Sequence, residues 1–223
     1  MSQLFFDFYQ THQIDNFREQ DFIFLPENSN VNQLLNNFFT DSVHNNLLKN
    51  IIIYGDSCVG KTHLLNIYAN KFRCEILNIS QFYDFNPLNH FQSKQIYILD
   101  DLSLFDNEHK ILQIINSANE IGARLILIYR EPAKYEIPDL ISRIKNIPNT
   151  KIESYCPTNL KIILANILAR KQIFLNQKLL DLIFTKSVTK SADVVFLTKK
   201  IEEIFNISGK KLTINNLNFI LNS

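Results

Sequence analysis

The stretch Ile51-Ile52-Ile53-Tyr54-Gly55-Asp56-Ser57-Cys58-Val59-Gly60-Lys61-Thr62 decides the fold of this chain. Its first four residues are apolar and predict a buried strand, and the rest matches the phosphate-loop pattern G-x-x-x-x-G-K-T. The chain contains only four glycines, and two of them, Gly55 and Gly60, stand where the backbone must turn tightly and approach a phosphate without a Cβ in the way. The stretch therefore indicates a nucleotide-binding protein.

The loop also predicts how the nucleotide is held. Backbone N–H groups of residues 56–62, with the N-terminus of the helix that follows, should cradle the phosphate oxygens. Lys61 should reach the β and γ phosphates, and Thr62 should ligate Mg²⁺. The residues expected at the nucleotide are Gly55, Asp56, Ser57, Cys58, Val59, Gly60, Lys61, Thr62 and His63, the last of which packs beside the loop's helix.

A second, acidic motif completes the predicted site. An apolar run at 96–99 ends in Asp100 and Asp101. Asp100 would hold Mg²⁺ together with Thr62, directly or through water, and Asp101 would orient or deprotonate the attacking water. Arg130 follows another apolar run and is a further nucleotide contact, since its charge can touch a phosphate. A guanidinium cannot polarise water as a carboxylate or an amide does, so Arg130 does not replace a polar sensor residue.

Strand-like and helix-like segments alternate up to residue 156. Helical spacing at 61–72 and 109–121 separates apolar runs that are typical of strands buried on both faces, which lie at 51–54, 75–79, 95–99, 124–129 and 151–155. This alternation predicts an α/β fold with a parallel sheet covered by helices. Beyond residue 156 helical spacing alone remains, at 158–171, 176–187, 191–205 and 213–221, with Thr158, Asn176, Ser191 and Thr213 as N-caps.

The pattern divides the chain into three parts. Residues 1–30 form an N-terminal extension, irregular over 10–31 and able to wrap the edge of the sheet. Residues 31–156 form the nucleotide-binding domain, and residues 157–223 form a small all-helical domain.

Composition narrows the class of protein. The 223 residues are 46% hydrophobic, enough for a core without a structural metal or disulfide. Cys58, Cys74 and Cys156 show no C-x-x-C spacing, and we interpret them as small buried side chains in a reducing cytoplasm. The net charge of +1 predicts that any contact with DNA runs through a partner. The N-terminus does not show a basic region followed by an apolar one, and no apolar run approaches the ~20 residues that a membrane-spanning helix needs. No membrane partner is therefore expected.

Two groups of residues resemble a known family. Gly60-Lys61-Thr62-His63-Leu64-Leu65 and the paired Asp100 and Asp101 resemble the DnaA clade of AAA+ ATPases, and residues 157–223 are similar to the lid domain of that clade. The resemblance spans nearly the whole chain and implies ADP or ATP with Mg²⁺ as cofactors.

More narrowly, the run from Arg130-Glu131-Pro132 to Pro138-Asp139-Leu140-Ile141-Ser142-Arg143 is similar to the Hda branch, regulators that inactivate the replication initiator DnaA. The initiator itself continues into a helix-turn-helix domain that reads origin DNA. This sequence ends with the lid-like residues 157–223, so the resemblance implies the regulator and not the initiator. The regulator would be associated with the nucleoid through its partners.

The resemblance also assigns roles to single residues. Arg143 stands at the arginine-finger position and would act in trans on DnaA-bound ATP, where such a finger is worth ~10³ to 10⁵ in rate. In the lid, the family carries an arginine with apolar residues two, six and nine positions later, and Leu197, Ile201 and Ile204 put Val195 in its place. Lys199 or Lys200 is the alternative phosphate contact. We therefore expect slow hydrolysis by the protein alone, with the nucleotide serving to order an interface.

The N-terminal Gln3-Leu4-Phe5-Phe6-Asp7-Phe8 resembles the sliding-clamp-binding motif of the same branch. In an extended peptide Leu4, Phe6 and Phe8 share one face and can enter apolar pockets, while Gln3 is a polar anchor. The alternative is an edge strand that folds back on its own domain. The partners implied are DnaA and the DNA polymerase III sliding clamp, with DNA reached through the clamp; a homo-oligomer stays open.

Three functions follow from these observations. The first is the switch-off regulator of replication initiation. The second is an autonomous ATPase or helicase-loader-like motor, which Lys61, Thr62, Asp100 and Asp101 permit but the missing lid arginine disfavours. The third is a nucleotide-stabilised adaptor that joins two proteins without catalysis in either.

Overall fold

A computed structural model describes residues 19–40, 48–78, 87–104, 106–131 and 134–208 of the chain. The motif at residues 3–8 and the helix expected at 213–221 lie outside these residues. Within the described ranges, every helix is too short or too polar to cross a bilayer.

The core of the first domain is a parallel sheet. Its strands are β1 Asn50–Tyr54, β2 Glu75–Asn78, β3 Ile96–Asp100, β4 Arg124–Tyr129 and β5 Asn149–Lys151. Their order is β2-β3-β4-β1-β5, and every pairing is parallel. Continuous apolar runs such as Ile51-Ile52-Ile53 form these strands because both of their faces are covered. The prediction of an α/β fold with a parallel sheet is confirmed.

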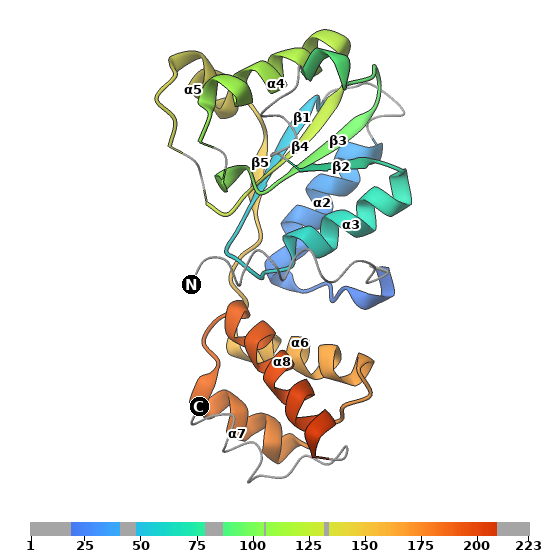
Figure 1. Ribbon diagram of the computed structural model, residues 1–223, viewed down its shortest axis with the longest axis vertical. Helices are drawn as coiled ribbons and strands as arrows, with labels where there is room; N and C mark the ends of the chain where they lie inside the picture. Colours follow the sequence, from blue (N-terminus) through green and yellow to red (C-terminus); the bar gives the residue numbers. More distant parts are fainter. Residues whose placement is uncertain (1–18, 41–47, 79–86, 105, 132–133, 209–223) are drawn as a thin grey trace.

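Helices cover both faces of the sheet (Figure 1). The blue and teal helices α2 Pro26–Thr40 and α3 Lys61–Phe72 lie on one face, and the green helix α4 Glu108–Ile121 and the olive-yellow helix α5 Pro138–Lys145 lie on the other. Alternate residues of β1 divide between two apolar clusters: Ile51 and Ile53 pack with Leu64 of α3, whereas Ile52 packs with Ile111 of α4. The carboxyl ends of β1 and β3 therefore deliver the phosphate loop and the two aspartates to one edge.

A helical domain, which we call the lid, follows the sheet. It consists of α6 Pro157–Arg170, α7 Gln177–Ser187 and α8 Ser191–Ile207 and lies below the sheet domain in Figure 1. Leu160, Leu164 and Leu168 of α6 are fully buried, as the helical spacing predicts. Asn176 caps α7 by accepting from Leu179 N at 2.9 Å, as predicted. The predictions of Thr158 and Ser191 as N-caps are wrong, because Pro157 and Ser191 are themselves the first helical residues and Cys156 and Lys190 precede them.

The last strand is shorter and earlier than the predicted 151–155. It ends at Lys151, after which Ile152 N still donates to Tyr54 O at 2.9 Å before the chain leaves the sheet for the lid. Ile152 and Tyr155 are buried without belonging to a strand, since they fill the space beneath the phosphate loop. Burial alone therefore produced the apolar pattern that predicted a longer strand.

The prediction of an irregular segment over residues 10–31 is wrong in its last part. Helix α2 begins at Pro26, a residue whose fixed φ suits the first helical position. Val31, Leu35, Phe38 and Phe39 form its buried face. The cysteines also differ from prediction: Cys58 and Cys156 are exposed and Cys74 is half-buried, because Cys58 lies on the phosphate loop and Cys156 on the connector to the lid.

Candidate nucleotide-binding site

The phosphate loop joins β1 to α3 and is shaped by its two glycines. A Cβ on Gly55 would stand 2.8 Å from the carbonyl oxygen of Ile152, so only glycine fits beneath the connector to the lid. Gly60 has φ +93° immediately before α3, a conformation that side chains rarely adopt. Cys58 adopts φ 65° at the crown of the loop. The backbone is thus bent into the concave turn that presents N–H groups to an anion.

Lys61 lies across this turn. Its Nζ donates to the carbonyl oxygens of Gly55 at 2.5 Å and Asp56 at 2.8 Å. Burial is the main reason that the pKa of Lys61 is lowered, while the charges of Asp100 and Asp101 act in the opposite direction. A half-buried ammonium held within the phosphate loop fits the phosphate contact expected of Lys61.

Thr62 and Asp100 meet at the base of the loop. Thr62 Oγ1 donates to Asp100 Oδ2 at 2.9 Å, which brings a hydroxyl and a carboxylate oxygen from α3 and β3 to one point. Burial raises the pKa of Asp100, and Asp101 raises it further, against the lowering effect of the Thr62 hydrogen bond. Hard oxygen ligands with room for a bound phosphate suit Mg²⁺, so these two residues would hold the ion when the nucleotide brings it.

Asp101 has a different partner. Its carboxylate accepts from Arg130 Nη2 at 2.7 Å and from Arg130 Nε at 3.2 Å. The structure therefore brings Asp100, Asp101 and Arg130 together at the ends of β3 and β4, with the carboxylate of Asp101 directed at the Arg130 guanidinium.

The lid faces the phosphate loop across a cavity of about 250 Å³. Asp56 and Ser57 of the loop, Ser154 and Tyr155 of the connector, and Lys190, Ser191 and Ala192 at the start of α8 line it. Ser154 Oγ donates to Asp56 Oδ2 at 2.7 Å and so ties the connector to the loop. These lid and connector residues belong to no sequence motif, and only the predicted helix start at 191 marked their region.

A larger hollow of about 500 Å³ lies elsewhere, between the start of α4 and the segment before α5. Asp106, Glu108 and Glu136 are among the residues that line it. Their carboxylates would repel phosphates, so the smaller cavity at the loop is the candidate for the nucleotide.

Three cationic side chains act on Cys58, at the crown of the loop. Lys61, Arg130 and Lys199 all act on the thiol of Cys58 and favour its ionised form, although partial desolvation of the thiol, on a residue that is exposed overall, raises its pKa more strongly. Lys199 comes from α8 of the lid, on the helix face opposite the buried Val194, Leu197 and Ile201. The ammonium of its neighbour Lys200 instead lies 4.6 Å from the centre of the Phe196 ring. Of Lys199 and Lys200, Lys199 is thus the one whose charge acts on the thiol of the loop.

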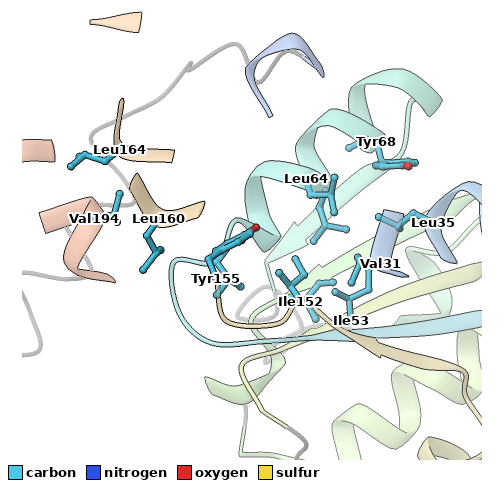
Figure 2. Close-up of a cluster of buried hydrophobic side chains, with 14 of the residues drawn as sticks. Val31, Leu35, Ile53, Leu64, Tyr68, Ile152, Tyr155, Leu160, Leu164 and Val194 are labelled. Atoms are coloured by element: carbon cyan, nitrogen blue, oxygen red, sulfur yellow. The ribbon is translucent and has the colours of Figure 1, made fainter. Parts of the chain in front are cut away.

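The N-terminal segment and the connector pack against the start of α3 and the lid. The Phe22 ring packs edge-on against His63 at 5.3 Å between centres, beside Gly60. Figure 2 shows Tyr155 between the sheet-side residues Ile152 and Leu64 and the lid residues Leu160 and Val194. At the start of α2, Glu27 accepts from Cys156 N at 3.1 Å and from the Asn159 side chain at 2.8 Å. These contacts join the N-terminal segment to the loop helix and α2 to the lid.

Arg143 lies away from this cluster, on α5. Its side chain is 39% exposed and its Nε lies 3.4 Å from the Asp139 carboxylate one turn earlier. The segment before α5 is anchored because Glu108 of α4 accepts from the N–H groups of Glu136 and Ile137 at 2.9–3.0 Å. The structure thus presents Arg143 on a fixed surface helix. Gln3, Leu4, Phe6 and Phe8 lie outside the described residues.

Comparison with known proteins supports a fold assignment. No protein-family model matches the chain. The chromosomal replication initiator protein DnaA of Buchnera aphidicola is 26% identical over 79% of this chain and 46% of its own length. The chain thus spans less than half the length of this curated relative.

Solved structures give the same assignment. Domain III of the Thermotoga maritima replication initiation protein DnaA superposes with a TM-score of 0.77 at 17% identity, covering 95% of this chain and 98% of that one. AMPPCP-bound DnaA from Aquifex aeolicus gives a TM-score of 0.66 at 19% identity, covering 86% of this chain and 66% of that one. The chain has the DnaA-like AAA+ domain fold.

Proposed function

We propose that this chain, which has the DnaA-like AAA+ fold, is an adenine-nucleotide-binding regulator of replication initiation of the Hda type. It binds ADP or ATP with Mg²⁺, attaches to the DNA polymerase III sliding clamp through residues 3–8, and stimulates hydrolysis of DnaA-bound ATP with Arg143. DNA is then reached through the clamp, and the protein acts at the nucleoid through its partners.

The observation that carries nucleotide binding is the meeting of Lys61, Thr62 and Asp100 at the phosphate loop. One ammonium lies against the carbonyl oxygens of Gly55 and Asp56 in the loop, and one hydroxyl and one carboxylate lie 2.9 Å apart at its base. These are the groups that a phosphate chain and its magnesium ion require. The DnaA structure from Aquifex aeolicus with this fold is bound to AMPPCP, which supports an adenine nucleotide.

The trans-acting role rests on the exposure of Arg143. A finger must leave its own subunit and insert at a neighbour's γ-phosphate, where a guanidinium stabilises the charge on the transferring oxygens. Arg143 is 39% exposed, its Nε lies at a long 3.4 Å from both Asp139 oxygens, and the segment before its helix is held by Glu108. These features favour an arginine that can exchange its weak partner for a phosphate.

The test is hydrolysis of ATP pre-bound to the cognate DnaA, in the presence of DNA-loaded clamp. We expect the wild-type chain to accelerate it and Arg143→Ala to lose ~10³-fold or more of the acceleration. Lys145→Ala is the matched control, since it removes a neighbouring charge from the same helix and should retain the effect.

The same experiment separates the alternatives. Equal stimulation by wild type and Arg143→Ala contradicts the finger. No stimulation at all, with intact nucleotide and clamp binding, favours the non-catalytic adaptor. Robust turnover of ATP by the chain alone favours the autonomous ATPase or helicase-loader-like protein. Deleting residues 1–8 should abolish clamp binding, and unchanged binding would contradict the clamp motif.

A further inference from the structure

The ion pair between Asp101 and Arg130 stands at the point where hydrolysis would occur. Nη2 and Nε of the guanidinium donate to separate carboxylate oxygens, at 2.7 and 3.2 Å. Such a two-point pair fixes the relative orientation of both groups and is stronger than a single contact. We propose that Arg130 withholds Asp101 from the attacking water, so that the chain retains a bound triphosphate; this inference rests on the nucleotide binding proposed above.

The backbone holds both partners in place. Asp101 has φ 55°, which turns its side chain out of the line of β3. Arg130 N donates to Ser103 Oγ at 2.7 Å, and Arg130 O accepts from Gly55 N of the phosphate loop at 3.2 Å. The pair therefore belongs to the framework of the loop and does not depend on a flexible surface side chain alone.

The two neighbouring carboxylates thus take separate tasks. Asp100 is directed at Thr62 and the magnesium position, whereas both oxygens of Asp101 are directed at Arg130. Lys61 and Lys199 supply positive charge toward the crown of the loop without Arg130. The charges of Lys61 and Lys199 can therefore attract a phosphate while the ion pair between Asp101 and Arg130 remains intact.

The chemical step shows what the pair prevents. The oxygen of a water attacks the terminal phosphorus, the bond from that phosphorus to the bridging β,γ-oxygen breaks, and ADP leaves with the electron pair. The water's proton passes through an acceptor to the phosphate product. A carboxylate that already accepts two charged hydrogen bonds is a weaker acceptor than one that is free to turn to the water. Hydrolysis is then slow although nucleotide binding is complete.

The test is Arg130→Met, which removes the guanidinium and keeps an unbranched side chain. Single-turnover hydrolysis of saturating ATP with Mg²⁺ should rise about fivefold, the rate equivalent of a partly exposed ion pair. The rise should disappear in Arg130→Met combined with Asp101→Asn. Arg130→Lys, which keeps the charge but not the two-point geometry, should give a smaller rise. Arg170→Met on the lid is the charge-matched control and should match wild type.

Direct binding distinguishes this role from a phosphate contact. Titration calorimetry with ADP and with AMPPCP should give Arg130→Met the same ratio of affinities as wild type, and thermal unfolding should confirm that the variant is folded. A selective loss of AMPPCP affinity with slower hydrolysis would overturn the proposal and assign Arg130 to the γ-phosphate. Unchanged hydrolysis would also overturn it. Failure of the wild-type chain to bind either nucleotide would instead reject the proposed function.

Discussion

The hydroxyl of Tyr155 donates to the carbonyl oxygen of Val59 at 3.0 Å, so the connector to the lid is bonded directly to the phosphate loop. The same hydroxyl accepts from Asn28 Nδ2 at 3.2 Å. Since Tyr155 is only 8% exposed, water does not easily replace these bonds. The position of the lid and the shape of the loop are therefore physically coupled.

Tyr155→Phe tests this coupling. Removing the hydroxyl leaves the buried Val59 carbonyl and the Asn28 amide each without one partner, which should lower the free energy of unfolding by about 1–3 kcal/mol. The affinity for ADP should fall as well, because the loop loses its support. Urea denaturation and calorimetry measure the two effects. Tyr54→Phe, at the end of β1, is the control and should change neither; equal effects in both variants would contradict the coupling.

Lys199→Ala and Lys200→Ala form a matched pair on α8. The charge of Lys199 acts on the Cys58 thiol of the loop, whereas the ammonium of Lys200 lies over the Phe196 ring. We expect Lys199→Ala to weaken ADP binding about fivefold at low salt, equivalent to an interaction of ~1 kcal/mol, and less at high salt because of screening. Lys200→Ala should stay within about twofold of wild type, on the same scale. Similar losses in both variants would indicate a general charge effect and not a specific contact.

Asp100→Asn should reveal a pH-dependent stability. Burial raises the pKa of Asp100 above its ordinary value of 3.8, so the folded state binds the proton more tightly than the unfolded state. The ionised carboxylate therefore costs stability, and the unfolding free energy of the nucleotide-free wild type should fall, relative to Asp100→Asn, as pH rises from 3.8 through the raised value.

Denaturation of both proteins between pH 3 and pH 7 measures the difference. At pH values below the pKa of Asp100 in the unfolded chain, the unfolding free energies of wild type and Asp100→Asn should depend equally on pH. Asp100 is then protonated in both the folded and the unfolded chain. Asp106→Asn, on the exposed segment after β3, is the control. A difference that grows toward low pH would contradict the effect of burial.

The sequence predicted best where one strong local signal operated. The helix over residues 61–72 and the strand over 124–129 are confirmed at both ends, because the phosphate loop fixes the start of one and a run buried on both faces defines the other. Helix α2 was missed because asparagines dilute its apolar face, although Val31, Leu35 and Phe38 carry the helical spacing. Ile152 and Tyr155 gave a strand signal for an irregular segment that happens to be buried.

The site shows a second limit of sequence analysis. Asp101 and Arg130 were both named as site residues, but their pairing joins the ends of two strands across 29 residues, and no spacing rule reports such a contact. Likewise, two adjacent lysines cannot be distinguished until the buried face of α8 is known. Residue types were therefore predictable, whereas the direction in which each side chain points required the packed structure.

Gly55 is constrained from two sides. Its missing side chain lets a phosphate approach, and it also leaves room for the carbonyl of Ile152, which would stand 2.8 Å from a Cβ. The second constraint is independent of any ligand. A descendant of this chain that no longer bound nucleotides would still need this glycine for as long as it retained the lid. The presence of Gly55 in such a descendant would therefore indicate that the lid is packed in the same way, and not that the protein binds a nucleotide.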